Sequence, residues 1–287
     1  MPKSKRRKAP NRKPAPSNKR KNTAKKLVVF PDGRQVHRDY QIRPLNIDLE
    51  QCLTAAASND SGFAVAMVPT ALAVDWIRTS PANVCVQICA HLVDAYRLLG
   101  VEAHIVPVTA AITEGPNIAC YGEDPPRWNN DVYVGHCFVS LPGVERFVDP
   151  TIQQFDGFQR RKHPYVGKMV FTSQDRQPVP GDRLNLLVED RAMLYTVAQA
   201  DEVFIVDHPV IQRAREENNR IAANIAAQTI EIFRTFNMAE DLTDHQRIRT
   251  MLDVVGDAEF HVEHGAARFI IDGQARWIDE LLPTTGA

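Results

Sequence analysis

Three residues of different chemistry, Cys85, His136 and Asp149, stand where they can act together on an acyl group. Cys85 opens a segment of helical periodicity, and the positive end of a helix dipole favours the nucleophilic thiolate. His136 and Asp149 stand on either side of a tight turn expected at Pro142-Gly143, so antiparallel pairing brings them near each other. There the carboxylate can hold the imidazole, and the imidazole can take the thiol proton. The set predicts nucleophilic thiol chemistry.

The elements that must position these residues follow from the hydrophobic pattern. Apolar residues recur at helical spacing from Cys85 to Leu99, and Gly100 then favours the end of that helix. A long loop rich in Gly, Pro and Asn is expected over residues 113–131. The other elements expected before residue 205 are helices over Ile47–Ser58 and Thr70–Thr79 and strands over Glu102–Ile112, Val132–Leu141, Val144–Val148, Lys168–Thr172 and Leu184–Glu189.

Three blocks of this sequence resemble the transglutaminase-like superfamily of papain-like thiol enzymes. In Asn83–Ala103, as in that family, a Cys opens a helix that closes about four turns later on an aliphatic pair and a Gly, before a strand. Gly135–Val139 is similar to the family's His-Ala-Trp block, although Cys and Phe replace its Ala and Trp. Phe147–Thr151 is similar to its Asp-Pro-Thr block. The blocks span roughly residues 70–155, about a third of the chain.

This resemblance implies an α+β fold, in which a Cys-bearing helix packs on an antiparallel sheet. It also implies that Cys85 is the nucleophile, His136 the base and Asp149 the group that orients the His. The expected reaction is acyl transfer through a Cys85 thioester, by hydrolysis or transamidation of a peptide or another amide. The alternative is that Cys85 is a small core residue. The domain would then be a catalytically inactive binding or scaffold protein.

The cysteine pattern indicates free thiols rather than disulfides or a zinc site. The chain has five cysteines, an odd number, and no Cys-x-x-Cys pair. Its basic N-terminus runs into only four apolar residues, fewer than the roughly 7–15 of a secretory signal, and no stretch approaches the roughly 18 apolar residues of a membrane span. We therefore expect a cytoplasmic protein without a membrane, metal or cofactor requirement.

Charge divides the chain into a basic arm and an acidic body. Residues 1–26 hold twelve Lys or Arg and no acidic residue, which leaves 22 basic and 35 acidic residues, a formal charge of −13, in the rest of the chain. Such an arm is expected to be disordered. It is either a solvated tail or an electrostatic site for nucleic acid or another polyanion, and its Lys5–Lys8 run fits nuclear targeting in a host with a nucleus.

The sequence predicts three regions: the arm 1–26, a transglutaminase-like catalytic domain 27–204 and a helical C-terminal region 205–287. Helices are expected over Pro209–Phe236, Thr243–Val255 and Ala266–Leu282. This last region is either a second domain or a cover on the first. A further alternative for the whole chain is a nucleic-acid-associated structural protein in which the arm and these helices act and Cys85 is irrelevant.

Overall fold

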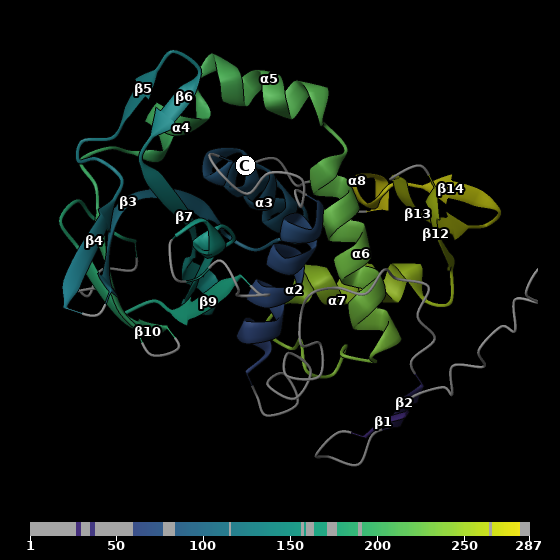
Figure 1. Cartoon of the computed structure of the whole chain (residues 1–287). Helices are drawn as coiled ribbons and strands as arrows, with labels where there is room; N and C mark the ends of the chain where they lie inside the picture. Colours follow the sequence, from purple (N-terminus) through teal and green to yellow (C-terminus); the bar gives the residue numbers. More distant parts are fainter. Residues whose placement is uncertain are drawn as a thin grey trace, which may run out of the picture.

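The computed structural model has an α+β architecture with a curled antiparallel sheet and several helices (Figure 1). The basic arm 1–26 and the helix expected over Ile47–Ser58 lie outside the described residues. A short antiparallel pair, β1 (Leu27–Val29) and β2 (Gln35–His37), forms a separate two-stranded sheet. The structure describes residues 27–29, 35–37, 60–76, 84–114, 116–155, 158, 164–170, 177–188, 191–263 and 266–281.

The main sheet runs in the order β10-β11-β3-β7-β8-β9, and every neighbouring pair in it is antiparallel. The long central strand β3 pairs with β7 through its first half and with β4 through its second half. Gly122 lies beside the point where the partner of β3 changes from β7 to β4. The backbone is crowded there, since a Cβ on Gly122 would stand 3.1 Å from the Val108 carbonyl oxygen and 3.4 Å from the His136 nitrogen. The strands are β3 (His104–Glu114), β4 (Asn117–Tyr121), β7 (His136–Leu141), β8 (Arg146–Asp149), β9 (Tyr165–Lys168), β10 (Arg183–Val188) and β11 (Arg191–Val197).

Apolar residues cover both faces of the sheet, and β7 lies between two cores. Alternation along β7 sends Cys137, Val139 and Leu141 toward the helices, and it sends Phe138 to the opposite core beside Phe147 of β8. Burial on both sides explains why β7 and β8 read as continuous buried runs.

The helix α3 (Cys85–Leu98) follows the expected pattern closely. Its C-terminus is a Schellman motif, in which the Gly100 N–H donates to the Arg97 carbonyl at 3.0 Å and the Val101 N–H donates to the Tyr96 carbonyl at 2.9 Å. Gly100 adopts φ +74°, a conformation that favours glycine. The predicted start at Cys85 and stop before Gly100 are both confirmed.

The preceding helix α2 (Ser61–Trp76) begins nine residues before the expected start at Thr70. Asp60 caps it, because its carboxylate accepts a hydrogen bond from the Phe63 N–H at 3.2 Å. Pro69 was expected to precede the helix, but it lies inside it. The expected start was therefore wrong. Pro disfavours the interior of a helix, but the burial of the apolar residues of α2 outweighs this preference.

The expected loop 113–131 contains two short strands. β4 continues the hairpin from β3, and β5 (Arg127–Asn129) pairs with β6 (Val132–Val134). Gly135 separates β6 from β7, so the single strand expected over Val132–Leu141 is two strands. The β5–β6 hairpin lies beside the helix α4 (Glu202–Val206) (Figure 1). The Trp128 indole N–H donates a hydrogen bond to the Phe204 carbonyl oxygen of this helix at 3.3 Å.

The C-terminal region is only partly helical. The expected single helix over Pro209–Phe236 is α5 (Pro209–Glu217) and α6 (Ile221–Thr235), and α7 (Gln246–Val255) follows. The expected helix over Ala266–Leu282 is wrong. This segment contributes to a three-stranded sheet and ends in a short helix, with β12 (Glu259–Glu263), β13 (Ala266–Ile271), β14 (Gln274–Arg276) and α8 (Ile278–Leu281). Asp272 and Gly273 form the turn of its second hairpin, with φ of 52° and 73°.

This region covers the first rather than forming a core of its own. In Figure 1, α2 and α3 lie between the main sheet and a layer formed by α6, α7 and α8. Residues of α3, α6, α7 and β13 belong to one continuous hydrophobic core. Within the described part of the chain, no helix is long and apolar enough to cross a membrane.

Candidate functional site

Cys85 is the first residue of α3, at the end of the helix that approaches the sheet. The next cysteine along the helix, Cys89, donates its thiol to the Cys137 carbonyl oxygen at 3.8 Å, which fixes this end of α3 against the start of β7. The Cys85 side chain is buried, with 4% of its surface exposed. The helix therefore places the thiol where the sequence analysis expected it, but in a closed environment.

His136 and Asp149 form a buried ion pair on neighbouring strands. The register pairs Val139 with Val148, which puts His136 and Asp149 diagonally across the same face of the sheet. The His136 Nε2 and the Asp149 Oδ2 are 2.9 Å apart, and both residues are almost fully buried. The second oxygen of Asp149 accepts the Thr151 N–H at 2.9 Å.

Asp149 remains ionised despite its burial. Burial alone would raise the pKa of its carboxyl, but His136, Tyr195 and the Thr151 backbone together hold that pKa below its ordinary value. The Tyr195 hydroxyl donates a short hydrogen bond to the oxygen that also faces His136. A carboxylate held in this way has a fixed orientation and can fix the imidazole in turn.

The imidazole of His136 is held through both of its nitrogens. Burial would lower its pKa, but the Asp149 carboxylate and, after it, the Cys85 thiol together outweigh burial and raise the pKa of His136 to about 10. The Gln154 side-chain amide lies 2.7 Å from His136 Nδ1. The ring also packs edge-on against Phe155, with centroids 4.8 Å apart. Since Nε2 faces Asp149, exchange of a proton with a thiol falls to Nδ1, the nitrogen that Gln154 contacts.

Cys85 interacts with both the His136 ring and the Cys137 thiol. Hydrogen bonding to Cys137, followed by burial, raises the pKa of the Cys85 thiol well above its ordinary value, and His136 lowers it by less. The expectation that the helix end and the imidazole make Cys85 a thiolate is therefore not met in this closed geometry. The resting pair is a neutral thiol beside an imidazolium.

The structure thus brings Cys85, His136 and Asp149 into one buried cluster, and it adds residues that the sequence analysis missed. Gln154 stands three residues after Thr151, and this Thr-x-x-Gln spacing is a capping-box signal that could have indicated its turn. Tyr195 comes from β11 and had no local signal. Among the other described cysteines, Cys89 and Cys137 are buried in the core and Cys120 is exposed.

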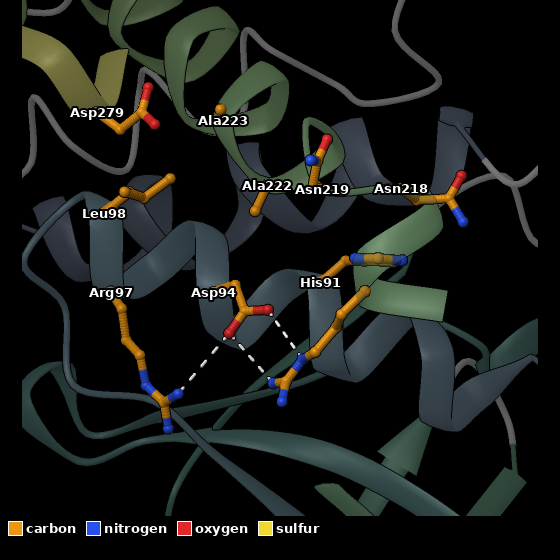
Figure 2. A pocket seen from close by; sticks show the side chains of 10 residues that line it. His91, Asp94, Arg97, Leu98, Asn218, Asn219, Ala222, Ala223 and Asp279 are labelled. Carbon is orange, nitrogen blue, oxygen red and sulfur yellow. Dashed lines mark hydrogen bonds and ion pairs between the residues drawn. The ribbon is translucent and has the colours of Figure 1, made fainter. Parts of the chain in front are cut away.

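A separate hollow of about 310 Å³ lies on another side of α3, and α5, α6 and α8 complete its wall (Figure 2). Asp94 on this wall is held by Arg215 through contacts of 3.1 and 3.0 Å. The His91 side chain faces this hollow and is largely buried. Burial, and then the charge of Arg215, lowers the pKa of His91 to about 4. No residue of the Cys85 cluster lines this hollow.

Comparison of the chain with protein-family models, curated proteins and solved structures finds no match. Within the described ranges, no group of three or more His, Cys, Asp or Glu side chains is arranged to hold a metal ion.

Proposed function

We propose that this protein is a thiol-dependent acyl-transfer enzyme with a papain-like, transglutaminase-like core. The observation that carries the proposal is the buried His136–Asp149 pair, 2.9 Å apart, with a cysteine at a helix N-terminus interacting with the same imidazole. A buried ion pair contributes little net stability, because desolvation offsets the attraction between the charges. A catalytic role gives this arrangement a physical reason.

The proposed reaction starts when the Cys85–His136 pair loses one proton and becomes a thiolate and an imidazolium. The thiolate attacks the carbonyl carbon of an amide, a C–S bond forms, and the carbonyl electron pair moves onto oxygen. The imidazolium then gives its Nδ1 proton to the amine, which leaves, and a thioester remains on Cys85. Water or a second amine attacks the thioester, while His136 takes the proton of that nucleophile and returns it to the sulfur.

Two features of the closed site bear on this reaction. Gln154 occupies the Nδ1 side of the ring, so it must release that nitrogen when a substrate enters. The pKa of His136 is raised to about 10 and that of the Cys85 thiol is also raised, so the pair loses its proton only under alkaline conditions. We therefore expect the rate of acylation to rise with pH up to about 10.

The test is acylation of the full-length protein by p-nitrophenyl acetate at about pH 9, followed by mass mapping of the acetylated peptide. Acetylation of Cys85 is expected in the wild type. Cys85→Ala and His136→Ala are each expected to abolish this acetylation, since nucleophile and base act as a unit. Asp149→Asn is expected to retain low residual activity, because Asp149 only orients the imidazole. Equal acetylation of wild type and His136→Ala would contradict the enzyme proposal.

The burial of Cys85 favours a second candidate, a transglutaminase-like scaffold tethered to nucleic acid by residues 1–26. On this hypothesis Cys85 resists iodoacetamide across the accessible pH range. The arm should then bind duplex DNA and RNA with an affinity that falls steeply with salt, because phosphate contacts release counterions. A matched truncated protein that starts at Leu27 should not bind. If the two proteins bind equally at low salt, the arm is not the polyanion site.

A further inference from the structure

Thioester formation passes through a tetrahedral oxyanion, which needs hydrogen-bond donors at the point where negative charge develops. One donor is present wherever a nucleophile opens a helix, since the N–H groups of the first turn have no acceptor within the helix. The backbone N–H of Cys85 is therefore a natural first donor. The proposed function needs a second donor. This donor must lie near the thiol and must not already be engaged in another hydrogen bond.

Among the described residues, the Tyr133 hydroxyl has this property. Its oxygen is buried and has no hydrogen-bond partner. Leaving a buried hydroxyl unsatisfied costs free energy, so such a group calls for an explanation. Other polar groups around the candidate triad are already engaged. The Tyr195 hydroxyl binds Asp149, and the Gln154 amide binds His136.

The local structure fixes the position of the Tyr133 ring. Tyr133 pairs directly with Trp128 across the β5–β6 hairpin, and their rings meet edge-on with centroids 5.2 Å apart. The ring also lies over Gly135, where an added Cβ would stand 2.7 and 2.8 Å from its carbons. Glycine at this position leaves room for the ring just before the strand that begins at His136.

This placement puts Tyr133 against the core that holds the reacting sulfur. Its side chain packs against the same hydrophobic core to which Cys85, Cys89 and Cys137 belong. Burial, and then the neighbouring Cys137, Cys85 and Cys89, raise the pKa of the Tyr133 phenol, which keeps it protonated. A protonated phenol is a donor at every pH at which the enzyme would act.

We propose that the Tyr133 hydroxyl is the side-chain donor that binds the oxyanion formed when Cys85 attacks an acyl carbonyl. This inference rests on the proposed function and assigns the second donor of the same site. In the first step the C–S bond forms and the carbonyl π pair becomes the oxyanion, which accepts hydrogen bonds from Tyr133 and from the Cys85 N–H. When the oxyanion collapses, the C=O bond re-forms, the leaving group departs and both hydrogen bonds weaken.

The test uses Tyr133→Phe in the full chain, which deletes only the hydroxyl. Acetylation of Cys85 by p-nitrophenyl acetate, corrected for the Cys85→Ala background, is expected to slow by about 100-fold. Alkylation by iodoacetamide displaces iodide without forming an oxyanion, so its rate should stay within about twofold of wild type. Because the deleted hydroxyl is unsatisfied, the melting temperature should be unchanged or higher.

Tyr96→Phe is the matched control, because Tyr96 is a buried tyrosine whose hydroxyl is satisfied by the Ala66 carbonyl at 2.6 Å and by Thr70 at 2.8 Å. It should lower the melting temperature and leave the acetylation rate unchanged. The inference is overturned if Tyr133→Phe is acetylated at the wild-type rate, or if it loses acetylation and alkylation together with stability. Absence of Cys85-dependent acetylation in the wild type would instead overturn the proposed function itself, and this inference with it.

Discussion

At the scale of single residues, the state of the Cys85 thiol depends most on Cys137. This residue stands where the resembled family has Ala, and its thiol is the largest influence that raises the pKa of Cys85. The same interaction places a second sulfur beside the candidate nucleophile. The Cys137 thiol therefore favours the protonated form of Cys85 at rest.

Replacing Cys137 tests this view. Cys137→Ala removes the hydrogen bond between the two thiols, so the pKa of Cys85 should fall and its alkylation by iodoacetamide should become faster at neutral pH. The measurement is the pH profile of alkylation at Cys85, followed by peptide mapping. Cys120→Ala removes an exposed free thiol and should leave the profile in place. An unchanged profile in Cys137→Ala would show that burial alone sets the pKa.

The His136–Asp149 pair predicts a pH dependence of stability. The pKa of His136 rises from 6.5 to about 10 on folding, so the stabilisation from its proton is fully present below about pH 6.5 and is lost as the pH rises toward 10. Asp149→Asn removes the charge that causes the shift. The difference in melting temperature between wild type and this variant should be largest near pH 6 and shrink toward pH 10.

A matched control for this series is Asp279→Asn, which breaks a largely exposed pair with Arg220. Exposed pairs contribute little, so this variant should follow the wild-type profile. A constant difference between Asp149→Asn and wild type from pH 6 to pH 10 would show that the pair is not charged in the folded state.

The sequence could indicate the candidate triad because each member has a local signal. Cys85 opens a periodic helix, and His136 and Asp149 flank a short turn. Tyr195 could not be found in this way, because the pairing of β11 with β3 brings its hydroxyl to Asp149 over 46 positions of chain. Tyr133 was hidden for another reason: only the folded structure shows that its hydroxyl is buried without a hydrogen-bond partner.

At the scale of elements, the C-terminal end of α3 and the turn at Gly100 pack against the helix α7. An alanine at Gly100 would adopt φ +74°, and its Cβ would stand 2.5 and 2.7 Å from side-chain carbons of Arg247 on α7. Arg247 in turn donates to the Leu98 carbonyl at 2.8 Å, so it cannot move away freely. The strain at this position is therefore both conformational and steric.

We expect Gly100→Ala to lower the free energy of unfolding by more than the roughly 1–2 kcal/mol that a left-handed alanine costs. Gly181→Ala is the control, since Gly181 has φ +88° but an added Cβ would meet no atom within 4 Å. Chemical denaturation of both variants separates the two contributions. Equal losses would mean that α7 adapts to the methyl group without cost.

Elements were predictable where a single pattern extended over many residues. The periodicity of α3 and the Gly after it locate both of its ends. Short strands inside polar segments were missed, because β4 and β5 present too few alternating residues to outweigh the Gly and Pro around them. The β13–β14 hairpin was missed although Asp272-Gly273 is a strong two-residue turn signal, since the flanking apolar residues also fit a helix.

At the scale of the whole molecule, the boundary expected at residue 204 does not separate two cores. The helix α6 packs against α2 and α3, and residues on both sides of the boundary share one hydrophobic core. The sequence left two alternatives open, a second domain or a cover, because hydrophobic periodicity shows which face of a helix is buried but not against what.

A fragment of residues 27–204 should therefore not fold by itself. It would expose the faces of α2 and α3 that α6 covers, and such a surface favours aggregation. We expect the fragment to lack the cooperative thermal transition that a protein of residues 27–287 shows, as measured by circular dichroism and size-exclusion chromatography. A monomeric fragment with a cooperative transition would identify residues 27–204 as an independent domain.

The attachment of the β5–β6 hairpin to the helices gives the protein a natural optical probe. The Trp128 ring stacks on His208, with centroids 3.6 Å apart, while its neighbour across the hairpin is Tyr133. If the hairpin moves away from His208 when an acyl donor reaches Cys85, the indole separates from the imidazole. Such a separation changes both the surroundings and the emission of Trp128. Stopped-flow fluorescence of the unlabelled protein can thus time the opening of the site independently of bond formation at sulfur.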